Sequence, residues 1–110
     1  MRGKPEYTVD TNLPDRARLS GIMRLPDPQT YEHVLVSVRA ALQDGRAYTI
    51  DISGLTFMNS SGIRAIAGLV LESRRTGQSL SLVGASAVPW HRKTASALKD
   101  LYPGLTVTLA

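Results

Sequence analysis

The chain has 110 residues, of which 43% are hydrophobic and 20% charged, and both values are ordinary for one globular domain. We therefore expect a single domain over residues 1–110. The absence of cysteine excludes disulfides, thiolate metal ligands and cysteine nucleophiles. No apolar run approaches the length of about 18 residues that a membrane helix needs. Residues 1–10 lack the apolar core of a signal peptide, so a cytoplasmic protein without membrane contact is expected.

The formal net charge of +4 raises the question of an acidic partner. The basic residues, however, are scattered along the chain. Their densest groups, Arg74-Arg75 and His91-Arg92-Lys93, are too short for a basic tract. A nucleic-acid-binding protein is therefore only a minor alternative, and we expect no direct contact with nucleic acid.

Alternating side chains predict a hairpin near the start of the chain. Residues 1–5 are expected to be flexible. Residues 6–10 and 17–24 alternate polar and apolar side chains, as half-buried strands do, and Pro14 marks the turn between them. Ile22 interrupts the second alternation, which leaves the end of that strand open.

One amphipathic helix is predicted to follow the hairpin. Asp27 can cap free helix amides, and Pro28 suits the first helical position because its missing N–H costs nothing there. Apolar residues then recur at three- and four-residue intervals as far as Leu42, and Gly45 ends the helix.

Strands and helices alternate in the rest of the chain. Residues 47–52 form a β-rich run with little polar interruption, which predicts a strand covered on both faces and followed by a bend at Ser53-Gly54. A helix is predicted to open at the Asn59-Ser60-Ser61-Gly62 turn and to end at Gly77. Further strands are predicted over residues 79–83 and 105–109, and a further helix over residues 87–101 with core contacts at Trp90, Ala97, Leu98 and Leu101. The order β-β-α-β-α-β-α-β predicts an α/β fold whose mixed, mostly parallel sheet has about five strands.

The most specific signal lies in residues 51–63, DISGLTFMNSSGI. This segment places Asn59-Ser60-Ser61-Gly62 at a junction between a strand, a loop and a helix. A serine there precedes helix amides that have no partner within the helix. A phosphate on it would meet the positive end of the helix dipole and would add about two negative charges without unfolding the domain. Gly62 keeps this turn free of bulk, so that another protein could approach closely.

In order and spacing, the chain from Tyr7 to Leu109 resembles the STAS domains, the family that includes the bacterial anti-sigma factor antagonists. Their central motif is a hydrophobic strand ending in Asp, a short loop, and an Asp-Ser-Ser/Thr-Gly turn that opens a helix. The resemblance implies that Ser60, with Ser61 as second choice, is phosphorylated by an anti-sigma factor that is a serine kinase of the histidine-kinase-like ATPase type. The unmodified protein would bind this kinase, phosphorylation would abolish binding, and a serine phosphatase would restore it.

The resemblance also implies a partner-binding surface, made of Asn59, Ser60, Ser61, Gly62 and Arg64. The chain departs from the family pattern at two places. The first, Asn59, favours an alternative, a non-phosphorylated STAS scaffold or accessory subunit of a transporter or signalling complex. The second, in the loop after the second strand, indicates a divergent branch with a different partner. Asn59 replaces the acidic residue of the motif. The loop Ile22-Met23-Arg24-Leu25 is apolar and basic, where antagonists often carry acidic residues.

For Ser60, Asp51 and Arg64, two interpretations are open. Ser60 could serve only as a helix cap, since serine is favoured there. Asp51 either positions the motif loop through hydrogen bonds to its amides or faces solvent at the end of its strand. Arg64 either contacts a partner or the Ser60 phosphate, or lies on a solvated helix face.

No catalytic, metal or cofactor site is predicted. His33 and His91 have no Asp, Glu or His at metal-ligand spacing. The chain also lacks a Gly-x-Ser-x-Gly elbow and a glycine-rich nucleotide loop. We therefore expect a binding module and not an enzyme.

Overall fold

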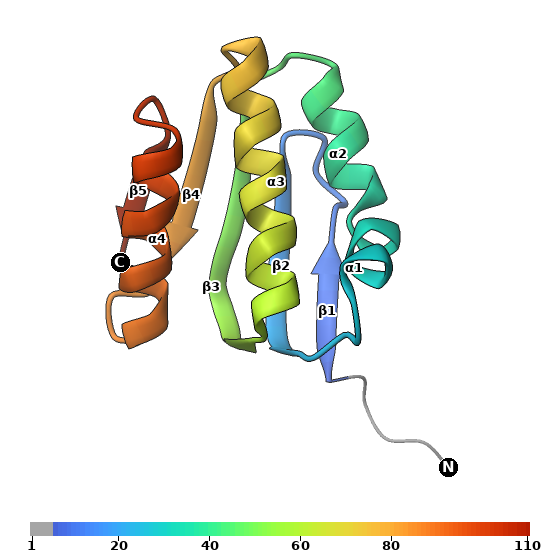
Figure 1. Cartoon of the computed structure of the whole chain (residues 1–110), viewed down its shortest axis with the longest axis vertical. Coiled ribbons are helices and arrows are strands. Elements are labelled where there is room, and N and C mark those ends of the chain that lie inside the picture. Colours follow the sequence, from blue (N-terminus) through green and yellow to red (C-terminus); the bar gives the residue numbers. More distant parts are fainter. Residues whose placement is uncertain (1–5) are drawn as a thin grey trace.

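The computed structural model describes residues 6–110 and contains one five-stranded sheet (Figure 1). Its strands lie in the order β1-β2-β3-β4-β5, with β1 antiparallel to β2 and the other neighbours parallel. The strands are β1 (Tyr7–Asp10), β2 (Arg16–Met23), β3 (Tyr48–Met58), β4 (Leu80–Gly84) and β5 (Thr106–Leu109). The helices are α1 (Pro28–Val34), α2 (Val36–Gln43), α3 (Ser60–Thr76) and α4 (Pro89–Leu101). The α/β class and the mixed, mostly parallel sheet are confirmed, while residues 1–5, predicted to be flexible, lie outside the described residues.

β1 and β2 form the predicted hairpin, with Val9 opposite Leu19. The register of β2 against β3 shifts between Gly21 and Ile22, where the alternation in the sequence breaks. Gly21 has φ +91°, and a Cβ there would lie 2.2 Å from the carbonyl oxygen of Glu6. Only glycine permits this conformation and this close approach. The pairing of β1 with β2 at the end away from their turn therefore depends on Gly21.

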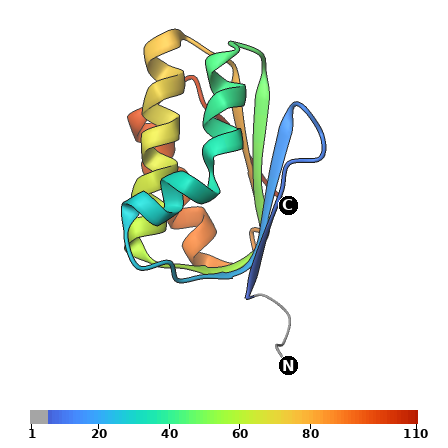
Figure 2. The ribbon, with the colours of Figure 1, turned by 90° about the vertical axis from the view of Figure 1, so that its right-hand side faces the viewer.

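All four helices of the described residues lie on one face of the sheet, and the opposite face is uncovered (Figure 2). The prediction that the central strand is covered on both faces is therefore wrong. Ile50 and Ile52 point into the core, and Thr49 and Asp51, which alternate with them, point to the uncovered face. No helix within residues 6–110 combines the length and the apolar character needed to cross a membrane.

The single helix predicted after the hairpin is in fact two helices, because the backbone turns at Leu35. Leu35 ends α1 with φ −99° and ψ 15°, and its side chain is buried. The turn allows Tyr31 of α1 to reach the end of β3, while Val38 and Leu42 of α2 pack in the core. Apolar spacing continues unbroken across this turn, so periodicity alone does not reveal it. The order is β-β-α-α-β-α-β-α-β.

β3 continues through the predicted bend at Ser53-Gly54 as far as Met58. Arg18 lies opposite Asp51 and Ser20 opposite Gly54, so β3 contains a bulge at this point. A Cβ on Gly54 would lie 2.9 Å from the Ser20 hydroxyl oxygen. A side chain at position 54 would have to displace the Ser20 hydroxyl, so the close approach of β2, and not a turn, favours glycine here.

The core lies between the sheet and the helices and is mainly aliphatic. The buried residues of α4 are His91, Ala95 and Leu98. Of the core contacts predicted for this helix, Leu98 is confirmed, Trp90 and Leu101 pack against the core while partly buried, and Ala97 is exposed. The prediction for Ala97 is wrong because the inner face of α4 is centred on His91 and Ala95.

Candidate functional site

The Asn59-Ser60-Ser61-Gly62 turn lies at the carboxyl end of β3, where the chain enters α3 (Figure 1). Asn59 is the N-cap of α3: its Oδ1 accepts a hydrogen bond from the Gly62 N–H at 3.2 Å. Its backbone carbonyl accepts from the N–H groups of Gly62 and Ile63 at 3.0 and 3.1 Å. Ser60 is thus the first residue of the helix and not its cap, so capping does not explain the serine at this position.

Both ends of the Asn59 side-chain amide have partners. Its Nδ2 donates to the carbonyl of Leu25 at 2.9 Å, and its Oδ1 also accepts from the Tyr31 hydroxyl at 2.7 Å. The Asn59 N–H donates to the carbonyl of Met23 at 3.2 Å. An aspartate could accept the same two bonds, but it would set a carboxylate oxygen against the Leu25 carbonyl. The amide therefore supplies the Leu25 backbone carbonyl with a donor that an aspartate lacks.

The buried side chain of Tyr31 supports the Asn59 cap from the core side. From the sequence alone, Tyr31 is only one of the apolar positions of the predicted helix. Its buried hydroxyl lies 3.1 Å from the carbonyl of Met23 and 3.4 Å from the N–H of Leu25, in addition to its bond to Asn59. Burial raises the pKa of the Tyr31 hydroxyl, so it stays a neutral donor. The sequence did contain a signal for this role: a tyrosine among aliphatic residues of a helix face has a hydroxyl that needs a hydrogen-bond partner once it is buried.

The two serines differ in exposure. Ser60 is exposed, whereas Ser61 is partly buried. Arg64, on the next turn of α3, is also exposed and belongs to none of the ion pairs of residues 6–110. Phe57, two positions before Asn59, is 44% exposed and was not singled out from the sequence. The first turns of α3 therefore present an exposed hydroxyl and an exposed cation on the same side of the helix.

Gly62, unlike these residues, is buried. A Cβ at this position would lie 2.5 Å from Cγ of Met58 and 2.7 Å from Cζ of Tyr31. The first turn of α3 therefore packs closely against the core. Glycine occupies position 62 because a side chain there would collide with Met58 and Tyr31.

Asp51 lies on the uncovered face of the sheet and bonds to the amide of Ser53, in the segment predicted as the motif loop, which forms the bulge of β3. Its Oδ1 accepts from the Ser53 N–H at 2.9 Å and from the Ser53 hydroxyl at 2.6 Å, and its Oδ2 lies 3.3 Å from Nε of Arg18. Burial by itself raises the pKa of Asp51, but the two Ser53 hydrogen bonds and the charges of Arg18 and Arg16 together lower it below its ordinary value of 3.8. Asp51 is therefore ionised at neutral pH and holds the local backbone.

Replacing Asp51 with asparagine is expected to lower the free energy of unfolding by about 1 kcal/mol near pH 7. Because the pKa of Asp51 is lower in the folded than in the unfolded protein, its stabilisation is present above 3.8 and is lost as the pH falls through the folded value. Urea unfolding measured at several acidic pH values should show wild type and Asp51→Asn converging at low pH. Ser53→Ala, which removes one of the two Ser53 bonds, should fall between them. An equal difference between wild type and Asp51→Asn at every pH would contradict this role.

Two side chains of α4 bond to the part of β3 that leads into the turn. β3 pairs with β4 only over residues 48–51, so its later residues have no strand partner on that side. There, Nε2 of His91 lies 2.7 Å from the carbonyl of Leu55, and Nε1 of Trp90 donates to the carbonyl of Thr56 at 2.8 Å. Trp90 thus has a hydrogen-bonding role besides the core packing expected of it.

The bonds of His91 determine its tautomer. Nδ1 accepts from the N–H of Ala85 at 3.0 Å, so the ring proton is on Nε2 and is donated to Leu55. This fully buried side chain joins the loop after β4 to the segment of β3 that carries the turn. Among the described residues, no three His, Cys, Asp or Glu side chains are grouped as metal ligands would be.

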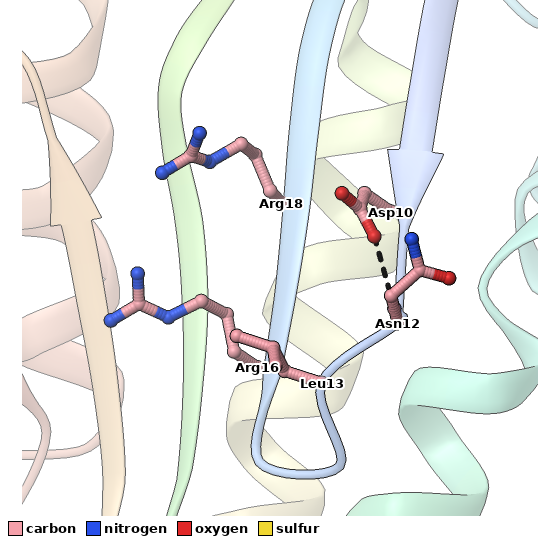
Figure 3. Close-up of a pocket in the computed structure, with 5 residues that line it drawn as sticks. All are labelled: Asp10, Asn12, Leu13, Arg16 and Arg18. Carbon is pink, nitrogen blue, oxygen red and sulfur yellow. Dashed lines mark hydrogen bonds between the residues drawn. The ribbon is translucent and has the colours of Figure 1, made fainter.

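A hollow of about 200 Å³ lies at the other end of the sheet, beside the turn between β1 and β2 (Figure 3). Its lining residues are Asp10, Asn12, Leu13, Arg16 and Arg18. Asp10 accepts from the Asn12 N–H at 3.0 Å, and the two arginine side chains extend away from them across β3 (Figure 3). The hollow contains none of the residues that the sequence predicted for the site.

Comparison with known proteins agrees with this geometry. A protein-family model described as "Mlab, STAS domain" matches residues 14–101. The matched span contains the Asn59-Ser60-Ser61-Gly62 turn and all four helices of the described residues. A comparison with curated proteins finds no match.

Proposed function

This chain belongs to the STAS-domain family, and we propose that it is a partner-binding regulator of the anti-sigma factor antagonist type, controlled by reversible phosphorylation of Ser60. The observation that carries the proposal is the placement of Ser60. Its hydroxyl is exposed at the first position of α3, directly after a cap whose hydrogen bonds do not involve it. A group added there changes the surface and leaves the fold intact.

The electrostatics of the turn favour a phosphate on Ser60. The first turn of α3 contains no acidic residue, and the N-terminus of a helix attracts negative charge. Arg64 lies four positions further along the helix, on the same side, and is exposed. A phosphoserine of about two negative charges would thus be tolerated by the domain and would reverse the local charge that a partner meets.

Two exposed residues flank the turn along the chain. An exposed aromatic ring and an exposed arginine, Phe57 and Arg64, are the residue types that protein interfaces favour. We propose that a serine kinase of the histidine-kinase-like ATPase type binds here when Ser60 is unmodified, and that a serine phosphatase reverses the modification. In this proposal the chain is a binding module and has no catalytic residue of its own.

The second candidate function is a STAS scaffold or accessory subunit that is not phosphorylated. Asn59 favours it, because the amide is built into the loop after β2 and the negative charge of the family motif is absent. The description of the matched family model names no sigma-factor pathway.

The test uses the purified chain and the purified kinase-type partner from the same organism, with ATP. Mass spectrometry is expected to locate phosphate on Ser60 in wild type and in Ser61→Ala, and none in Ser60→Ala. In calorimetric titrations without ATP, Ser60→Ala should bind the kinase within about twofold of wild type and Ser60→Glu at least about tenfold more weakly, because the added charge faces the partner.

Ser79→Glu is the matched control. Ser79 is exposed before β4, at the end of the sheet opposite the turn, so the same change of charge there should leave binding unaltered. Absence of phosphate on Ser60 together with normal binding of Ser60→Glu would exclude the switch and favour the scaffold.

A further inference from the structure

β5 is an edge strand with a free backbone side. It pairs with β4 over Thr106–Leu109, and within residues 6–110 no strand lies beyond it. The N–H of Ala110 donates to the carbonyl of Gly84 at 3.0 Å and so points toward β4. Since backbone groups alternate along a strand, the N–H and C=O groups of Val107 and Leu109 point outward. These groups can pair with another strand.

α4 passes over β5 (Figure 1). Beside this edge, residues of both elements line an apolar hollow of about 290 Å³. Its lining residues are Arg92, Ala95, Ser96, Lys99, Val107 and Leu109. Val107 and Leu109 are partly buried and pack against the core, so their side chains point to the helix side of the sheet. A strand added to β5 would therefore place alternate side chains in this hollow.

The rim of the hollow is basic. Arg92 and Lys99 are exposed, and neither belongs to an ion pair of the described residues. They lie about two turns apart on α4, or about 10 Å along the helix. Asp100 is exposed on the same helix but does not line the hollow, and Lys99 also donates to the carbonyl of Leu105.

We propose that the edge of β5 and this hollow form a docking site for an extended segment of a partner protein that carries an apolar residue between two acidic ones. Helix-facing residues of an added strand recur at every second position, so the two acidic residues of such a segment lie about 13 Å apart and match Arg92 and Lys99. A second copy of the chain is a poorer occupant, because pairing β5 with β5 would bring the cations of both copies together. The site is separate from the Ser60 turn and does not depend on its phosphorylation.

The probe is a capped peptide, glutamate-threonine-valine-threonine-glutamate, titrated into the full chain labelled with ¹⁵N. Its glutamates and valine would face α4, and its threonines would extend the uncovered face beside Thr106 and Thr108. Chemical-shift changes are expected to cluster in β5 and α4. A peptide with lysine in place of glutamate should bind at least about tenfold more weakly, and so should a peptide that is N-methylated at alternate residues and cannot pair.

Variants of the chain separate charge from backbone pairing. Arg92→Glu should weaken binding at least about fivefold, whereas Arg74→Glu, the same change on an exposed position of α3, should not. Val107→Pro removes an outward N–H without touching the ladder to β4, and it should bind more weakly than Val107→Ala, which removes only side-chain atoms. Ser60→Glu should bind the peptide as wild type does, so failure of the phosphorylation switch leaves this test intact.

Equal binding of the glutamate and lysine peptides, or equal binding of the N-methylated peptide, would overturn the proposal. So would analytical ultracentrifugation that shows self-association abolished by Val107→Pro, because a second copy would then be the occupant.

Discussion

Replacing His91 with alanine is expected to lower the free energy of unfolding by about 3–5 kcal/mol, the largest effect of a single substitution foreseen for this chain. The side chain is fully buried and has two backbone partners, the carbonyl of Leu55 and the N–H of Ala85. Its removal leaves both groups without a partner in an apolar surrounding and also leaves a cavity. Each of these costs free energy that the backbone cannot recover by small movements.

His33→Ala is the matched control, because His33 is exposed on α1 and should change stability by no more than about 0.5 kcal/mol. Urea unfolding followed by circular dichroism measures both variants. Hydrogen exchange should, in addition, show faster exchange in the segment from Leu55 to Ser60 of His91→Ala, since this side chain holds the end of β3. A loss of stability equal to that of His33→Ala would show that the two hydrogen bonds contribute little.

Two glycines of the same helix are expected to respond to alanine with opposite signs. Gly62→Ala should lower the free energy of unfolding by about 1–3 kcal/mol, because the new Cβ would lie 2.5 Å from Cγ of Met58 and 2.7 Å from Cζ of Tyr31. Gly68→Ala should raise it by about 0.5–1 kcal/mol, since alanine favours the helix and the nearest atom, Nη2 of Arg39, lies 4.0 Å away.

The comparison separates packing from helix propensity, because both substitutions improve propensity and only Gly62→Ala creates contacts that are too short. Thermal and urea unfolding of the two variants would test it. If Gly62→Ala also stabilised the chain, the first turn of α3 would have to lie further from Tyr31 than the structure places it. Under the proposed function, Gly62→Ala should also weaken binding of the proposed kinase, since the turn carrying Ser60 must shift.

Local patterns in the sequence were sufficient for the type and order of most elements. Alternation over residues 6–10 and 17–24 predicted the hairpin, and apolar spacing predicted the helices that cover the sheet. The motif of residues 59–62 was located from the sequence at a strand-to-helix junction, where the structure has it. Each of these signals comes from neighbours along the chain, which is why a single sequence contains it.

Other features depended on contacts between distant segments. The turn at Leu35 leaves the apolar spacing unchanged, and β3 passes Ser53-Gly54 because β2 lies against it. The absence of cover on one face of the sheet likewise follows from the path of the helices, not from the composition of any strand (Figure 2).

The sequence by itself determined the family motif, the class of fold and the serine to be tested. Only the tertiary structure decided which residues hold that serine in place. Asn59 meets Tyr31 and Leu25, 28 and 34 positions away, and His91 meets Leu55, 36 positions away. The physical reason is that a buried polar group must find a partner, and the fold supplies that partner from whichever segment passes nearby.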